Sequence, residues 1–225
     1  MKKLLLSAVV TLSLLSSGCS SVFSDVRATF DYALAKPEPA QLNETELAAF
    51  PYTALYASWA DDPQIMLVLG FIDGQEFHWI TGSRETVVTQ HGRVVRTADI
   101  DYGIVDTSNL AGDPLRCILQ ETCATRWQRE ASFVDAKNNK FSRVIDSQFE
   151  VTGRTQVELP MGTRDVYEVV ERGHFALTNE GKERRAFTNY FWLEADGHVV
   201  KSQQLLVPGR RALTLTQVKW IGRDE

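Results

Sequence analysis

The sequence predicts a mostly β protein, built as an antiparallel meander that forms either a β-sandwich or a strongly curved, partly open barrel. Beyond Pro51, short segments rich in Val, Ile, Thr, Phe, Tyr and Trp alternate with turn signals. There are about ten or eleven such segments, and no helical periodicity separates them. Sandwich and barrel both satisfy this pattern, so the choice between them stays open.

The first nineteen residues resemble the signal of a bacterial lipoprotein. Lys2 and Lys3 precede an apolar run over residues 4–15, and small residues then lead into Cys19. The run is too short for a bilayer-spanning helix, which needs about twenty residues. In the lipobox that this pattern resembles, Cys19 becomes the first mature residue and carries acyl chains such as palmitate. Ser16 departs from the usual aliphatic residue, and an ordinary signal with an incidental cysteine is the alternative.

Cleavage of the signal peptide, residues 1–18, would leave residues 19–225 as a single β-rich periplasmic domain. Its length suits one large β domain, and no linker divides it. The chain has 24 basic and 29 acidic residues, and removal of Lys2 and Lys3 brings the net charge to −7. This balance does not indicate nucleic acid, which favours a basic excess, so no nucleic-acid partner is expected.

One or two short helices are expected in the N-terminal segment, residues 22–50. Apolar residues recur at spacings of three and four over residues 22–34, and Pro37 ends that pattern. A second, shorter helix is predicted before Pro51. Asn43 can cap it, and Glu46 stands at the reciprocal position of a capping box.

The strands follow as hairpins. Asp73-Gly74 and His91-Gly92 mark tight turns, because two-residue hairpins need positive φ and glycine adopts it at little cost. The nearly continuous apolar run of residues 65–72 predicts a strand covered on both faces. The expected strands are Thr53–Trp59, Gln64–Ile72, Gln75–Thr81, Glu85–Gln90, Arg93–Thr97, Arg126–Asp135, Ser142–Thr152, Arg164–Leu177, Arg185–Glu194, His198–Val207 and Ala212–Trp220.

An irregular connection is predicted over Asp99–Ala124, where the periodicity fails. It contains Cys117 and Cys123, the cysteines that remain once Cys19 is acylated. In an oxidising compartment this favours one structural disulfide, which would contribute about 2 to 2.5 kcal/mol by restricting the unfolded chain. Free thiols, a metal site and redox activity are the alternatives, although the spacing is not C-x-x-C and a metal needs more ligands.

No catalytic motif is present, and no catalytic residue, metal or cofactor is predicted. The sequence lacks G-x-S-x-G, H-E-x-x-H and a Gly-rich phosphate loop. Asp99 and Asp101 lie two apart, so on an extended chain they would share a side, as in an acid/base or metal pair, and Asp106 follows. The simpler interpretation of these carboxylates is a solvated strand edge.

Aromatic and basic residues supply the candidate ligand site. Tyr190-Phe191-Trp192 places rings on both faces of one strand, so at least one ring faces away from whatever Phe191 packs on. Rings with polar neighbours suit a groove for a sugar chain or a protein partner. The alternative is that they are ordinary core and surface residues. The candidates are Trp79, His78, Tyr190, Trp192, Arg184 and Arg185.

Several segments together resemble the YjbF/GfcB-type lipoproteins associated with group 4 capsule and exopolysaccharide production in Gram-negative bacteria. Besides Cys19, they are Pro51-Tyr52-Thr53-Ala54-Leu55-Tyr56, Gly92-Arg93-Val94-Val95-Arg96-Thr97, and Asn189-Tyr190-Phe191-Trp192 with Gly197, Ser202 and Pro208. Asp99-Ile100 departs from the Gly-Leu of many members. The resemblance implies a β-rich outer-membrane lipoprotein facing the periplasm and acting in polysaccharide secretion or assembly, and it carries no catalytic residues. Ser20 agrees with outer-membrane sorting.

We therefore expect a non-enzymatic accessory protein, anchored to the outer membrane by lipid, that binds a polysaccharide chain or a protein of the secretion machinery. One alternative is a carrier that shelters an acyl chain or amphiphile in a half-open barrel, which would need a dry apolar cavity. The other is a polysaccharide-modifying enzyme that uses Asp99, Asp101 or His78.

Overall fold

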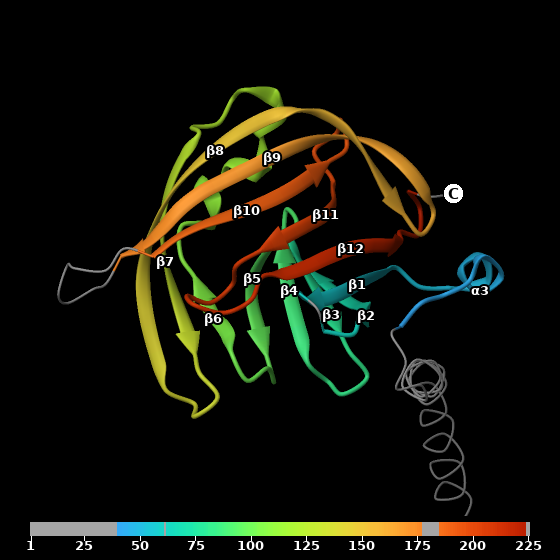
Figure 1. Ribbon diagram of the computed structural model, residues 1–225, viewed down its shortest axis with the longest axis horizontal. Helices are drawn as coiled ribbons and strands as arrows, with labels where there is room; N and C mark the ends of the chain where they lie inside the picture. The colour runs from blue at the N-terminus through green and yellow to red at the C-terminus, as the bar shows by residue number, and fades with distance from the viewer. Residues whose placement is uncertain (1–39, 61, 177–184, 224–225) are drawn as a thin grey trace, which may run out of the picture. The chain divides into compact units, whose positions relative to one another are not determined.

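A single antiparallel sheet of twelve strands dominates the computed structural model, which describes residues 40–60, 62–176 and 185–223 (Figure 1). The strand order is β5-β4-β3-β2-β1-β12-β11-β10-β9-β8-β7-β6, a meander that curves into a nearly closed barrel. This confirms the predicted β class and selects the barrel over the sandwich. The predicted signal peptide, Cys19, the helix expected at residues 22–34 and Arg184 lie outside the described residues.

Most strands follow the predicted segments to within three residues, whereas β8 continues seven residues beyond the predicted end at Thr152. They are β1 (Ala54–Trp59), β2 (Ile65–Asp73), β3 (Glu76–Ile80), β4 (Thr86–Gln90), β5 (Arg93–Ala98), β6 (Gly103–Thr107), β7 (Arg126–Val134), β8 (Lys140–Leu159), β9 (Gly162–Ala176), β10 (Arg185–Leu193), β11 (Val199–Gln204) and β12 (Leu213–Lys219). The predicted turns are present, with positive φ at Gly74, His91 and Gly92. No helix in the described part of the chain is long and apolar enough to cross a membrane.

The short helix before Pro51 is α3 (Glu44–Ala49), and it begins with the predicted capping box. The Asn43 side chain accepts a hydrogen bond from the Glu46 backbone N–H, and the Glu46 carboxylate accepts one from the Asn43 N–H, both at 3.0 Å. These two bonds satisfy backbone donors that the first turn of a helix otherwise leaves unpaired.

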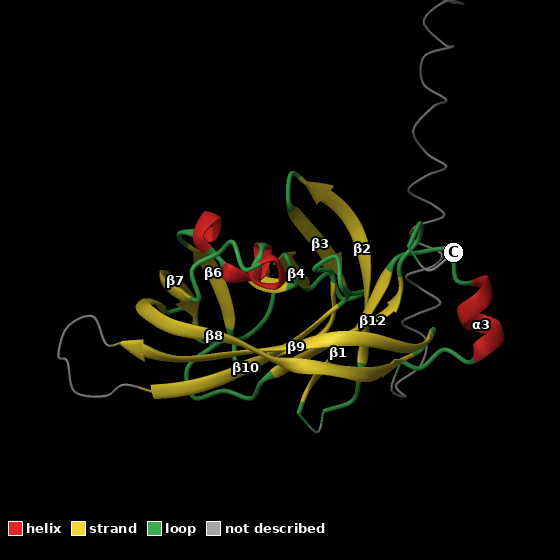
Figure 2. Ribbon diagram, turned by 90° about the horizontal axis from the view of Figure 1, so that it is seen from above, coloured by secondary structure: helices red, strands yellow, loops and turns green. Residues whose placement is uncertain are grey.

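Two predictions about the strands are wrong. The connection Asp99–Ala124 contains β6 and three 3₁₀ helices, η1 (Leu110–Gly112), η2 (Pro114–Arg116) and η3 (Ile118–Gln120). A register shift within β6 breaks the alternation by which a sequence reveals a strand. Strand β2 is covered on both faces only around Leu67 and Val68, whereas Phe71 and Ile72 are 53% and 55% exposed. The ends of β2 and β3 project beyond the rest of the sheet, which leaves them uncovered (Figure 2).

Strands β5 and β6 are the two ends of the hydrogen-bonded order, and side chains bridge the seam between them. Thr97 Oγ1 accepts a hydrogen bond from the Ile104 N–H at 3.0 Å, and Thr107 Oγ1 donates one to the Val95 carbonyl at 3.0 Å. The strand order contains no backbone ladder between β5 and β6. The hydroxyl groups of two threonines therefore provide hydrogen bonds that connect these strands and close the barrel.

A disulfide joins Cys117 and Cys123, with Cα atoms 5.6 Å apart. It closes the chain around η3. Beside it, Leu115 and Ile118 are buried in an apolar cluster with Trp127 and other residues of the sheet. The segment from η1 to Cys123 is therefore attached to the barrel by packing as well as by its own covalent bridge.

Replacing both cysteines with serine is expected to lower the free energy of unfolding by about 2 kcal/mol, because the unfolded chain regains the entropy of a short loop. Urea denaturation of the oxidised mature protein and of the double variant measures the difference. Reductant should produce a similar shift in the natural sequence and none in the variant. Equal stability of the two proteins under oxidising conditions would contradict the prediction.

Candidate functional site

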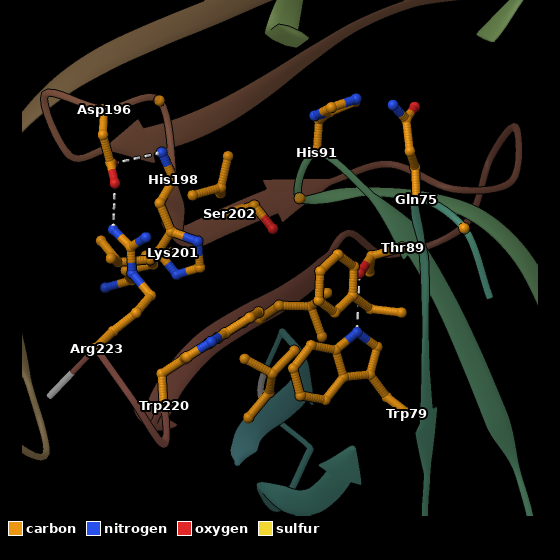
Figure 3. A pocket seen from close by; sticks show the side chains of 18 residues that line it. Gln75, Trp79, Thr89, His91, Asp196, His198, Lys201, Ser202, Trp220 and Arg223 are labelled. Carbon is orange, nitrogen blue, oxygen red and sulfur yellow. Dashed lines mark hydrogen bonds and ion pairs between the residues drawn. The ribbon is translucent and has the colours of Figure 1, made fainter. Parts of the chain in front are cut away.

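A cavity of about 400 Å³ opens between the turns at one end of the barrel (Figure 3). We call it the aromatic cavity. Its aromatic wall consists of Phe77, Trp79 and Trp220. Its polar groups come from the β2–β3 turn, β4, the β4–β5 turn, the β10–β11 turn, β11 and the segment after β12. Its volume lies within the range of about 300 to 1,000 Å³ that is usual for small-ligand sites.

The three rings of the aromatic wall pack on one another. The ring centroids of Trp220 and Phe77 are 5.4 Å apart, and those of Trp220 and Trp79 are 5.7 Å apart. Trp79 is only 1% exposed, and its Nε1 donates a hydrogen bond to Thr89 Oγ1 at 2.8 Å. Trp79 therefore forms a fixed base of the wall, whereas Trp220 is half-buried and offers more of its surface to the cavity.

Opposite charges compensate one another at the polar side. Arg223 Nη2 donates hydrogen bonds to Asp196 Oδ2 at 2.6 Å and to Glu194 Oε2 at 2.9 Å. Asp196 also accepts a hydrogen bond from the His198 backbone N–H at 3.1 Å. Burial lowers the pKa of His198, although a hydrogen bond with Gln217 partly opposes this effect, so the imidazole is neutral at pH 7.

His91 belongs to the β4–β5 turn and lines the cavity. Burial lowers the pKa of its imidazole, and the nearby Asp113 carboxylate opposes that effect. Its Nε2 atom is buried and has no hydrogen-bond partner among the described protein atoms. The turn needs glycine at its second position, because a Cβ atom on Gly92 would lie 2.3 Å from Val199 Cβ.

A second set of polar residues, which we call the central ion network, fills the middle of the barrel. Glu171 is 0% exposed, and it accepts hydrogen bonds at 2.9 Å from Arg93, Arg129 and Asn189. Arg93 also pairs with Asp113, through Nε and Oδ2 at 2.5 Å. Two guanidinium groups thus face two carboxylates, and the buried charge sums to zero.

The network keeps its members ionised. Burial alone raises the pKa of Glu171, but the charges of Arg129 and Arg93 outweigh it and hold the pKa at about 2. Both guanidinium groups also lie over aromatic rings, with Arg129 4.1 Å and Arg93 4.8 Å from the centroid of the Trp127 ring. The network joins β5, β7, β9, β10 and the start of η2, so it connects β5, at one end of the strand order, to β7, which is next to the other end.

Stability should fall as the pH falls from about 4.5, the ordinary pKa of a glutamate, towards about 2, the pKa of Glu171 in the folded protein. In this range the unfolded chain binds a proton that the folded protein does not, and protonation therefore favours unfolding. Urea midpoints measured across this range should decline, and the decline should be smaller in Glu171→Gln. Parallel curves for the two proteins would contradict this assignment.

The sequence did not indicate this network as a site, although it carried a signal. Glu171 lies two residues after Val169 on β9, so the two side chains share the inward face of that strand. Likewise, Arg129 lies between Trp127 and Ala131 on the inward face of β7. A charge at an inward position of an alternating strand indicates a buried partner of opposite charge. The partner itself could not be identified, because Arg93 and Glu171 are 78 residues apart in the chain.

The predicted ligand-binding residues lie in separate places. Trp79 lines the aromatic cavity. His78, beside it on β3, stacks on the ring of Phe71 with centroids 4.1 Å apart and lies outside the cavity lining. Tyr190 and Trp192 also lie outside the cavity lining, although their rings are close together, with centroids 6.1 Å apart.

Of the basic pair, Arg185 is exposed at the start of β10, and Arg184 lies outside the described residues. The carboxylates Asp99, Asp101 and Asp106 are exposed, and Asp99 has a positive φ of 58°, so the extended geometry assumed for the first two is absent. No group of three or more His, Cys, Asp or Glu side chains within the described ranges could hold a metal ion.

Comparison with known proteins gives consistent matches over most of the chain. A family model described as "Group 4 capsule polysaccharide lipoprotein gfcB, YjbF" matches residues 27–218. The lipoproteins YjbF and GfcB of Escherichia coli strain K12 are 25% and 26% identical to the chain. The alignments cover 88% and 92% of this chain, and 90% and 94% of those proteins.

The crystal structure of the lipoprotein YmcC from Escherichia coli K12 superposes with a TM-score of 0.76 at 23% identity. The match covers 91% of this chain and 98% of that one, and it shows the same fold. The family match confirms the expectation drawn from the sequence motifs. The chain belongs to the YjbF/GfcB family of group 4 capsule polysaccharide lipoproteins.

Proposed function

We propose that this lipoprotein is a non-enzymatic accessory of capsule or exopolysaccharide secretion, and that it binds a polysaccharide chain in the aromatic cavity. The observation that carries the proposal is the wall of Phe77, Trp79 and Trp220 facing hydrogen-bonding groups such as Gln75 and His198. A sugar ring has an apolar face of C–H groups and an edge of hydroxyl groups. Aromatic rings cover the face while polar side chains bond the edge.

The chemistry of the cavity favours binding over hydrolysis. Glycosidases use two carboxyl groups about 5 to 9.5 Å apart, one on each side of the scissile bond. Among the described lining residues Asp196 is the only carboxylate, and it is paired with Arg223. An acid/base pair would need a second carboxylate at the cavity. The alternative of an enzyme that uses Asp99, Asp101 or His78 therefore receives no support from the cavity.

The alternative of an acyl-chain carrier is also less well supported. A carrier needs a dry apolar cavity long enough for a hydrocarbon chain. The barrel interior instead holds the central ion network, and the cavity lined by Arg93, Arg129 and Asn189 has a volume of only about 20 Å³. An acyl chain entering there would separate Glu171 from its two arginines, which is energetically costly.

The proposed location is the periplasmic face of the outer membrane, with acyl chains on Cys19 as the anchor. Family membership and the lipobox pattern support acylation, and Ser20 supports outer-membrane sorting. More than one acyl chain makes such an anchor stable, whereas one is marginal. Mass spectrometry of the mature N-terminus tests this, because an unmodified chain, or one that begins elsewhere, would contradict it.

Replacing Trp220 with alanine is expected to weaken binding of capsule-type polysaccharide about tenfold or more, equivalent to about 1.4 kcal/mol. The variant removes the half-buried ring of the aromatic wall while leaving Trp79 in place. Calorimetric titration of the mature protein with polysaccharide purified from producing cells measures the effect.

The matched control is Trp192→Ala, which removes another half-buried tryptophan outside the cavity lining. Its affinity should stay within about twofold of the natural sequence. Equal losses in the two variants would indicate a general disturbance of the fold. Absence of binding by the natural sequence would overturn the proposed function.

A further inference from the structure

Four chain segments contribute residues to the lining of the aromatic cavity (Figure 3), and hydrogen bonds and packing contacts connect each segment to the next. They are the β2–β3 turn with β3, the β4–β5 turn, the β10–β11 turn with the start of β11, and the segment after β12. The first contact joins the β2–β3 turn to β4, because Gln90 Nε2 donates a hydrogen bond to Gln75 Oε1 at 2.8 Å.

The other contacts complete the ring. Gly92 of the β4–β5 turn packs closely against Val199 of β11, and Gln204 Nε2 donates a hydrogen bond to the Gly92 carbonyl at 2.9 Å.

The segment after β12 is connected on both sides. Arg223 pairs with Asp196, which joins the β10–β11 turn to the segment after β12. Trp220 of that segment contacts Phe77 of β3. Within the described residues, each of the four segments is thus connected to both of its neighbours around the opening.

The floor of the cavity is closed as well. Its residues include Leu55, Ser202 and Leu215, which are buried. Ser202 accepts a hydrogen bond at 2.9 Å from Gln204 Nε2, and Gln204 in turn accepts one from the Val94 N–H at 3.0 Å. Beyond this layer lie the central ion network and the apolar clusters, so the cavity does not continue through the barrel.

From this geometry we infer that the aromatic cavity binds the free end of a polysaccharide chain and does not hold the middle of a chain. This inference rests on the proposed function. A cavity with a closed rim and a closed floor admits a polymer only end-on, because an internal segment would need two exits. The volume of about 400 Å³ suits a short terminal piece of the chain.

Chain-length dependence tests the inference. Capsule-type polysaccharide from producing cells is cleaved into fractions of different mean length with the same repeating unit, and each fraction is titrated calorimetrically with the mature protein. End binding predicts a constant number of protein molecules per chain, so that binding per unit mass rises in inverse proportion to length. A number per chain that grows with length would overturn end binding while leaving the proposed function intact. No binding of any fraction would overturn both.

A narrowed rim provides a second test. Gly74 lies at the rim with a φ of 59°, and no atom lies within 4 Å of the position that a Cβ would take there. Asparagine tolerates this backbone conformation, so Gly74→Asn should fold and narrow the opening. We expect at least a tenfold loss of affinity for the shortest fraction that binds.

The control is Gly162→Asn at the β8–β9 turn, since Gly162 also has a positive φ, of 107°, similarly open surroundings and no place in the cavity lining. Its affinity should be unchanged. Full affinity in Gly74→Asn would show that the chain does not enter through this opening, and would overturn the inference.

Discussion

Replacing Glu171 with glutamine is expected to lower the free energy of unfolding by about 3 to 5 kcal/mol. The change keeps the shape of the side chain but removes the charge that balances Arg93 and Arg129. Both guanidinium groups would then stay buried with Asp113 as their remaining carboxylate. Charges removed from water without a partner of opposite sign are among the most destabilising features of a protein interior.

Urea denaturation followed by tryptophan fluorescence measures this effect. The matched control is Glu150→Gln, which breaks the ion pair of Glu150 with Arg172, whose side chains are 60% and 57% exposed. An exposed pair of this kind contributes about 0 to 1 kcal/mol. Equal stability losses in the two variants would show that the central ion network does not contribute through buried charge.

Trp79→Ala should destabilise the fold by about 3 to 5 kcal/mol, the usual cost of removing a large buried aromatic side chain. The indole is almost completely enclosed, contacts Phe77 and Trp220, and is hydrogen-bonded to Thr89. Its loss leaves a cavity in the core and an unpaired Thr89 hydroxyl group. Thermal unfolding should show a clear decrease in melting temperature.

Trp79→Phe should cost less, because it retains most of the apolar volume and loses the hydrogen bond. Trp192→Ala removes an equally large ring from a half-buried position and is likewise expected to cost less than Trp79→Ala. If Trp192→Ala were the more damaging variant, Trp79 would not have the structural role assigned here. The distinction matters for binding studies, since Trp220 is the better probe of the cavity.

Local patterns were sufficient for much of the fold. The glycines at positions 74 and 92 predict hairpins because their positive φ is a local property of two or three residues. The capping box of α3 is similarly local, since Asn43 and Glu46 are three residues apart. The predicted strands depend on side chains that alternate between two environments along one chain. Strand β6 was missed because its register shift removes that alternation.

The candidate site was less predictable. Trp79 was identified, but the aromatic cavity also depends on Trp220, His198 and Arg223, which lie 119 to 144 residues further along the chain. No spacing rule connects them. They meet because β12, the last strand, pairs with β1, the first strand. This pairing joins the two ends of the chain, and no hairpin in the sequence predicts it.

By itself, the sequence determined the β class, the hairpins, the cysteine pair and the family. Each of these depends on residues that are close together in the chain or on short sequence motifs. The tertiary structure decided that the sheet closes into a barrel, that Glu171 neutralises two arginines at its centre, and that four distant segments enclose the aromatic cavity. The physical reason is that closure brings together residues far apart in the chain. Their contact energies depend on three-dimensional distance, which alternation along one strand does not encode.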